Sequence, residues 1–192
     1  ESFKGIGGIG LISSRLTLEG PISDKLTYII SGRRMYIDII QEQFKENTLI
    51  PHYNFFDVNG KFVFRASEID RITLSGFHGK DFLYNPPASK DVAYDINWGN
   101  TTLNLNWLRL AEEKKFTSVS LNYTGYRFQT IITDKNPDAF KQDFYSTSSI
   151  EDFAVRIDGQ YFSTDNHTVK NGIEVILHNF NLVNNNFFVP TL

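Results

Sequence analysis

Alternation of apolar and polar residues along short segments is the feature that most constrains how this chain can fold. In the segment 102–107 the apolar residues Leu103, Leu105 and Trp107 alternate with three polar ones. A period of two puts successive side chains on opposite faces of an extended strand, so the pattern predicts strands with one apolar and one polar face. The same pattern defines eight predicted strands, at 15–19, 26–33, 55–65, 71–76, 102–107, 118–125, 152–161 and 169–177.

The connections between the predicted strands alternate between two kinds. Tight, charged turns are expected at 20–25, 67–70, 111–115 and 163–166, and longer connections at 38–51, 79–94 and 128–148. An up-and-down antiparallel barrel that crosses a membrane has this asymmetry, with short periplasmic turns and long extracellular loops. A short helix is expected at 37–44, inside the first long connection.

The polar face of the predicted strands carries Ser, Thr and Asn, whereas formal charge collects in the turns and loops. In 118–125 this face consists of Ser118, Ser120, Asn122 and Thr124. Small uncharged polar residues suit a hydrated lumen, and the 17 Phe and 9 Tyr of the chain fit the aromatic girdles of a membrane barrel. We therefore expect an all-β fold: an antiparallel transmembrane β-barrel segment of about eight strands, with residues 1–192 in one barrel domain.

The sequence excludes one other architecture and leaves two alternatives open. No segment approaches the roughly 18–20 consecutive apolar residues that a membrane-spanning helix needs, which excludes a helical membrane protein. A soluble ligand-binding β-barrel stays open as an alternative, because the same aromatic residues would then form an ordinary core. A complete eight-stranded outer-membrane barrel, serving as an adhesin or structural protein, is the other alternative.

The chemistry-bearing residues do not form a catalytic or metal-binding pattern. There are no cysteines, and the four histidines lack the spacing of a local metal site. The string 5–10 satisfies G-x-G-x-x-G, but no strand precedes it and no helix is expected to follow, so it does not indicate a nucleotide site. We expect no enzyme activity and no cofactor. The balance of 19 basic against 22 acidic residues also argues against a nucleic-acid partner.

Arg33 and Arg34 are the weak candidates for ligand contact. They follow Gly32 near the expected outer end of the second predicted strand, where a pair of guanidinium groups could contact an anionic ligand. The alternative is that they form salt bridges inside the barrel and extend along its interface with the lipid.

Several strings resemble the early barrel of TonB-dependent receptors from Bacteroidota. They include L-E-G-P-I at 18–22 and S-G-R-R at 31–34, and the likeness extends through 12–22, 30–34, 36–38, 70–76, 98–100 and 166–172. Asn171 departs from the pattern, since an apolar or aromatic residue is expected before Gly172. The resemblance implies a parent barrel of about 22 strands in the outer membrane of a Gram-negative bacterium.

The resemblance also implies a function and a set of partners. Such a parent imports a large, scarce nutrient and is driven by the inner-membrane TonB complex. Its partners would be outer-membrane lipid, the rest of the barrel, an N-terminal plug and a surface lipoprotein. The plug and the TonB box are expected upstream of Glu1 and further strands downstream, so the chain is expected to be truncated at both ends. No ligand-binding residue can be carried over from the family.

Overall fold

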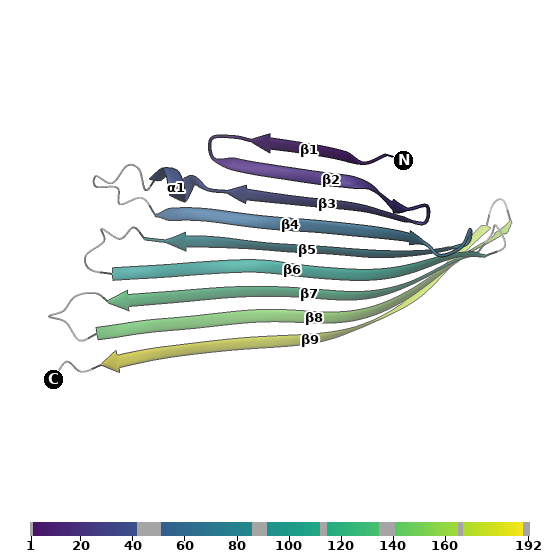
Figure 1. Ribbon diagram of the computed structural model, residues 1–192. Coiled ribbons are helices and arrows are strands. Elements are labelled where there is room, and N and C mark those ends of the chain that lie inside the picture. The colour runs from purple at the N-terminus through teal and green to yellow at the C-terminus, as the bar shows by residue number, and fades with distance from the viewer. Residues whose placement is uncertain are drawn as a thin grey trace.

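The computed structural model describes residues 2–41, 51–85, 92–111, 115–134, 141–164 and 167–189. Within them, nine strands form a single antiparallel sheet in which each strand pairs with its neighbours in sequence (Figure 1). The strands are β1 (Lys4–Ile9), β2 (Ser13–Ser23), β3 (Leu26–Met35), β4 (His52–Arg65), β5 (Asp70–Tyr84), β6 (Val92–Ala111), β7 (Lys115–Asp134), β8 (Lys141–Thr164) and β9 (His167–Val189). The all-β antiparallel architecture predicted from the alternation is therefore present.

The predicted count of eight strands was one too low. The additional strand is β1, which pairs with β2 from Lys4↔Glu19 to Ile9↔Ser14. Its sequence, KGIGGI, contains three glycines, and its two isoleucines fall on opposite faces. Because glycine has no side chain to mark either face, the segment gives no period-two signal.

Strands β5 to β8 extend well beyond their predicted bounds. The expected long connections at 79–94 and 128–148 were wrong in extent, because β5 continues to Tyr84, β6 begins at Val92, β7 continues to Asp134 and β8 begins at Lys141. The reason is that the alternation of polar and apolar residues changes phase within these strands. On β6 the even positions from Asn100 to Asn106 are polar, whereas nearer the start of the strand the even positions are the apolar Tyr94, Ile96 and Trp98. A single alternation therefore does not describe the whole strand.

The short turns from β2 to β3 and from β4 to β5 lie at one end of the sheet, the end at which β6 and β8 also stop (Figure 1). Between β4 and β5, Ser67 Oγ accepts hydrogen bonds from the backbone N–H groups of Ile69 at 3.3 Å and Asp70 at 3.0 Å. Pro21 occurs next to a β-bulge in β2, where the missing N–H does not interrupt the pairing. The turns predicted at 111–115 and 163–166 centre on 112–114 and 165–166, which lie outside the described residues.

The opposite end of the sheet carries the connections that follow β1, β3, β5 and β7. Helix α1 (Ile37–Gln41) occupies the start of the predicted helix at 37–44, whose remaining residues lie outside the described part. Asn54 Nδ2 of β4 donates a hydrogen bond to Asp38 Oδ2 at 3.0 Å, which ties α1 to the sheet. No helix in the described residues is long and apolar enough to span a membrane.

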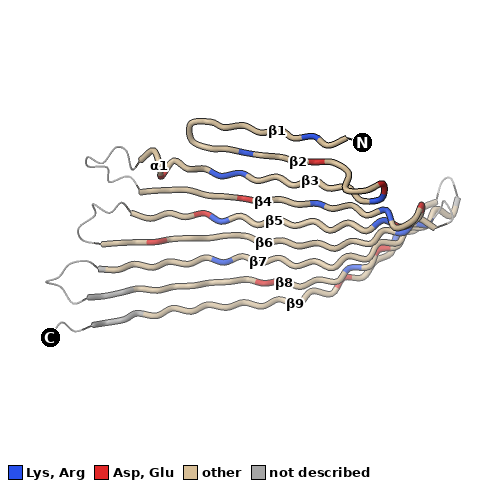
Figure 2. Tube along the Cα trace, viewed as in Figure 1, with Lys and Arg blue, Asp and Glu red and all other residues tan. Residues whose placement is uncertain are grey.

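The sheet is twisted but not closed into a barrel (Figure 1). Among the described residues, β1 pairs only with β2 and β9 pairs only with β8, so the sheet has two free edges. Figure 2 shows charged residues gathered where the strands meet the short turns, and a second set further along β3, β4, β5 and β7. The sheet has no second layer in the described residues, so its two faces determine what it can contact.

Candidate functional site

One face of the sheet carries a continuous band of apolar side chains. We call it face A; it is the face that bears Leu103, Leu105 and Trp107 of β6. The strand register aligns three rows across β3 to β9, and every residue in them is aliphatic or aromatic except two glycines. The rows, which we call the apolar band, are Leu26, Phe64, Ile72, Trp107, Val119, Ile157 and Ile173; Tyr28, Phe62, Leu74, Leu105, Leu121, Val155 and Val175; and Ile30, Gly60, Gly76, Leu103, Tyr123, Phe153 and Leu177.

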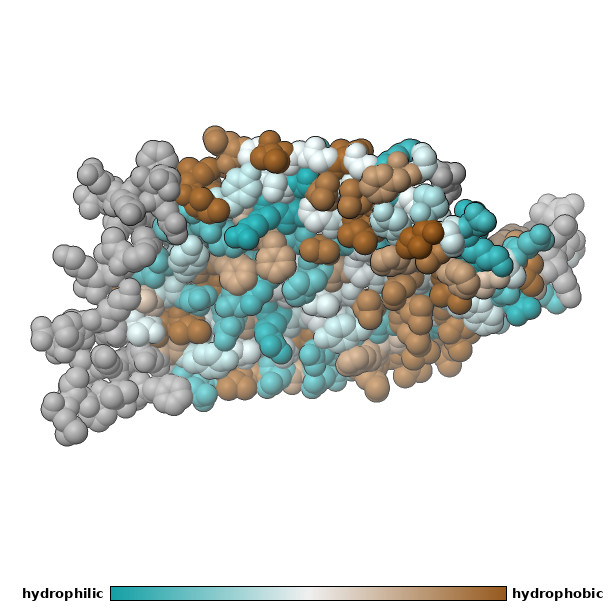
Figure 3. Space-filling model, viewed as in Figure 1, coloured by the Kyte–Doolittle hydropathy of each residue, from teal (hydrophilic) through white to brown (hydrophobic). Residues whose placement is uncertain are grey.

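The side chains of the apolar band are open to the surroundings and do not pack into a core. Leu103 is 50%, Leu121 49% and Phe153 53% exposed, and no hydrophobic residue in the described part of the chain is buried. Figure 3 shows hydrophobic side chains gathered over the half of the sheet nearer the short turns. A patch of this extent marks a surface that contacts another apolar phase.

The opposite face, face B, is polar along the same stretch of the strands. Asn104 Nδ2 donates to Asn122 Oδ1 at 2.5 Å, and Asn106 Nδ2 lies 2.7 Å from Ser118 Oγ and 2.8 Å from Ser120 Oγ. These five residues are half-buried, whereas the apolar residues between them on β6 are exposed. This arrangement is the reverse of a soluble protein, in which the apolar face is the sheltered one.

Beyond Gly99, toward the end of the sheet that carries the longer connections, face B becomes aromatic. Trp98 stacks on Tyr53 and on Phe128, with ring centroids 6.4 Å apart in both pairs, and Phe55 lies 6.1 Å from Tyr53. The Tyr53 hydroxyl donates a hydrogen bond to Asp81 Oδ1. We call Phe55, Tyr53, Trp98 and Phe128 the aromatic row. It joins β4, β6 and β7 and presents flat apolar surface beside polar groups.

The structure places Arg33 and Arg34 on opposite faces of β3, because they are consecutive residues of a strand. Arg33 lies on face B, where its guanidinium forms an ion pair with Asp57 at 2.7 Å and lies 4.7 Å from the centre of the Phe55 ring. Arg34 lies on face A and is exposed. The two side chains therefore do not form a joint site, and ligand contact by either one stays a prediction.

Face A changes character next to the apolar band. One register row crosses β3 to β7 through Arg34, Phe56, Lys80, Gly99 and Arg127. We call Arg34, Lys80 and Arg127 the cationic row. Sequence reasoning missed it, apart from Arg34, because the three residues come from separate strands and only the register aligns them.

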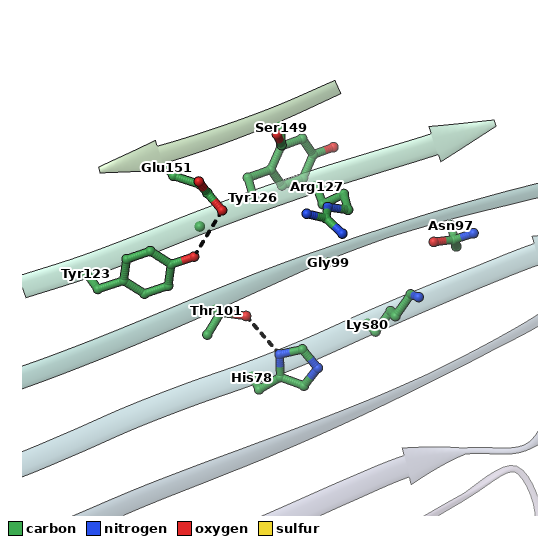
Figure 4. Close-up of a pocket in the computed structure, with 11 residues that line it drawn as sticks. His78, Lys80, Asn97, Gly99, Thr101, Tyr123, Tyr126, Arg127, Ser149 and Glu151 are labelled. Atoms are coloured by element: carbon green, nitrogen blue, oxygen red, sulfur yellow. Dashed lines mark hydrogen bonds between the residues drawn. The ribbon is translucent and has the colours of Figure 1, made fainter. Parts of the chain in front are cut away.

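A hollow of about 260 Å³ lies along the cationic row (Figure 4). Its lining includes Lys80, Gly99 and Arg127, together with His78, Thr101 and Glu151. His78 Nδ1 is 2.9 Å from Thr101 Oγ1, and the Tyr123 hydroxyl lies 3.5 Å from Glu151 Oε1. His78 and Arg127 are exposed, and Lys80, Thr101 and Glu151 are half-buried. Since these groups are polar, the hollow suits a polar or charged group held at the surface.

The sites described above are surfaces on the two faces of the sheet. No group of three or more His, Asp or Glu side chains in the described part of the chain could hold a metal ion. No family model matches the sequence, and no curated protein is similar to it at a significant level. The two faces of the sheet are therefore the features from which a function can be inferred.

Proposed function

We propose that this chain forms part of the wall of a TonB-dependent importer in the outer membrane of a Gram-negative bacterium. Face A would contact lipid, and face B would line the water-filled interior of the barrel. The observation that carries the proposal is the exposed apolar band on one face, opposite a sheltered, hydrogen-bonded polar face. A bilayer solvates the first, and an enclosed aqueous lumen solvates the second.

The height of the apolar band supports the proposal. At the short-turn side it ends at Asp70, whose carboxylate lies 3.9 Å from Arg109 Nε and accepts a hydrogen bond from Trp107 Nε1 at 3.0 Å. At the other side it ends before Thr101, in the register row that also carries His78 and Glu151. Thr101 to Arg109 spans about 26 Å of strand at roughly 3.3 Å per residue. A strand tilt of about 40° reduces this to ~20 Å, close to the apolar zone of about 25 Å in outer-membrane barrels.

The length of the later strands supports a large barrel. Strands β6 to β9 have 20, 20, 24 and 23 residues, whereas about 9–11 residues suffice to cross a bilayer. The sheet therefore continues past the apolar band, on the side of the longer connections. There the aromatic row of face B would line the outer part of the interior, where an incoming ligand is first met. The plug, the TonB complex and a surface lipoprotein are partners that only the family resemblance implies.

The free edges also favour a large parent barrel over a complete small one. A closed eight-stranded barrel would pair its first and last strands, but β1 and β9 of the described sheet have no such pairing. In a bilayer, the unpaired N–H and C=O groups of an edge strand need partners, because lipid offers none. Further strands of a larger barrel would supply them.

Cell fractionation of the full-length gene product tests the location. We expect the protein in the outer-membrane fraction, extractable only with detergent and shifting in gel mobility on heating, as a folded barrel does. A plug upstream and further strands downstream in the full reading frame would support the importer. A monomeric, folded product that remains soluble without detergent would contradict the proposal.

A further inference from the structure

The cationic row places three positive side chains at the edge of the apolar band. Arg34 of β3, Lys80 of β5 and Arg127 of β7 come from alternate strands, and the residues between them in the row, Phe56 and Gly99, are uncharged. With strands about 4.8 Å apart, neighbouring cations of the row are separated by roughly 10 Å at their Cα atoms. That spacing leaves room for an anionic group between two of them.

The three cations of the cationic row form no ion pair in the described part of the chain, although the Glu151 carboxylate lines the same hollow. No ion pair there involves Arg34, Lys80 or Arg127, and Lys80 Nζ lies 4.9 Å from the centre of the Phe82 ring. Glu151, the acidic residue in the lining of the hollow, is instead approached by the Tyr123 hydroxyl and by Asn179 Nδ2. On face B, by contrast, the neighbouring Arg33 is paired with Asp57.

Gly99 keeps the space between Lys80 and Arg127 open. Figure 4 shows the Arg127 guanidinium directed toward the strand that carries Gly99, while the Lys80 side chain runs along its own strand toward Phe82. A Cβ atom at Gly99 would lie 2.7 Å from the carbonyl oxygen of Gly79 and 3.4 Å from Lys80 Cγ. The backbones of β5 and β6 approach too closely there for a side chain, so the hollow stays accessible from outside.

The position of the cationic row relative to the apolar band identifies the kind of anion. Along β6, Gly99 is followed on face A by Thr101 and then by Leu103 of the apolar band. A molecule with a phosphate at the cationic row and hydrocarbon chains on the apolar band would match both surfaces at once. Guanidinium and ammonium groups at this level suit phosphate oxygens, because charge-assisted hydrogen bonds to them are short and strong.

We propose that Arg34, Lys80 and Arg127 bind the phosphorylated headgroup of a lipid in the outer leaflet, whose acyl chains lie on the apolar band. This inference rests on the proposed function, because it takes face A to be the lipid-facing one. It adds a specific partner: the wall selects an anionic lipid at the level of its headgroup. Each cation contributes about a fivefold increase in affinity for an anionic membrane component.

The test uses the full-length protein in nanodiscs of phosphatidylcholine containing either monophosphoryl lipid A or its dephosphorylated form. Native mass spectrometry counts the lipid A molecules retained. We expect retention of the phosphorylated form only, about a fivefold loss with Lys80→Gln or Arg127→Gln, and about a hundredfold loss when all three cations are replaced by Gln. Arg15→Gln and Lys61→Gln remove the same charge from exposed positions on face B and should leave retention unchanged.

Three results would overturn the inference. One is equal retention by the triple variant and the unmodified protein; another is equal retention of the dephosphorylated lipid. The third is displacement of the lipid by millimolar inorganic phosphate, which would indicate a site for a soluble anion. Each variant is first shown to be folded by its heat-dependent gel mobility. If the unmodified protein is found outside the membrane fraction, the proposed function fails. If it is inserted but the substitutions leave lipid A retention unchanged, this inference alone fails.

Discussion

At the scale of single residues, neighbouring positions on a strand lie on opposite faces and therefore have different surroundings. Leu105 belongs to the middle row of the apolar band and is 40% exposed, whereas Asn104 beside it is half-buried and hydrogen-bonded to Asn122. Exposed leucine beside sheltered asparagine is unfavourable in water, because water solvates the amide and not the hydrocarbon. The pair suits a sheet whose apolar face is covered by another apolar surface, which is lipid under the proposed function.

A charge placed at each of these two positions should therefore have different effects. We expect Leu105→Arg to lower the free energy of unfolding of the full-length protein in lipid vesicles by about 2–4 kcal/mol, the cost of a cation near the middle of the bilayer. Asn104→Arg, which puts the same side chain on face B, should cost clearly less. Urea titration followed by gel mobility measures both, and a larger loss for Asn104→Arg would contradict the face assignment.

At the scale of elements, strands β6 and β7 each divide into two parts of opposite polarity. On β6, Trp107 lies on face A within the apolar band, and Trp98 lies on face B within the aromatic row. The same reversal occurs on β7, where Leu121 and Tyr123 face one way and Tyr126 and Phe128 the other. The reversal takes place where the sheet passes the edge of the apolar band. Under the proposed function, this is the level at which both faces change their surroundings.

The sequence predicted the elements well where one alternation persists, and poorly where it changes. Segments such as 102–107 and 118–125 lie inside β6 and β7, and the turn at 67–70 is where it was expected. The outer halves of these strands were taken for loops because the phase changes, and β1 was missed because it contains Gly5, Gly7 and Gly8. The cationic row could not be predicted, since its members lie 46 and 47 positions apart in the sequence (34 to 80 and 80 to 127) and only the pairing of β3 to β7 aligns them.

The two tryptophans of the chain test the reversal directly. The background is full-length protein in which every tryptophan outside these residues is replaced. In the Trp98→Phe variant Trp107 is then the single tryptophan, and we expect its fluorescence to be quenched strongly by brominated lipid and little by aqueous iodide. Trp98, present alone in the Trp107→Phe variant, should respond in the opposite way, because face B contacts water at that level. Equal quenching of both residues by brominated lipid would show that β6 does not change phase with respect to the membrane.

At the scale of the whole molecule, the described sheet has two free edges. Within the described residues, β1 and β9 are each paired on one side only, and the large apolar residues of β9 such as Ile173 and Leu177 are 65% and 68% exposed. An open sheet with such edges invites pairing with another chain. Under the proposed function, the described strands are one sector of a barrel wall whose remaining sectors protect these edges.

Residues 1–192 expressed alone should consequently fail to form a stable monomer in a bilayer. We expect aggregation or irregular oligomers after refolding into detergent or vesicles, whereas the full-length protein gives a single heat-modifiable species. Size-exclusion chromatography and gel mobility distinguish these outcomes. A stable, inserted monomer of the isolated 192 residues would indicate a complete small barrel instead of a sector.

The account depends on one claim, that face A meets lipid and face B meets enclosed water. The most direct measurement is a spin-label scan of residues 102–107 of β6 in the full-length protein in vesicles, at single introduced cysteines. We predict that labels at positions 103, 105 and 107 collide mainly with oxygen dissolved in lipid, and that labels at 102, 104 and 106 collide mainly with an aqueous nickel chelate. Labels at 103, 105 and 107 that are protected from both would place the apolar band in a dry protein interior and contradict the claim.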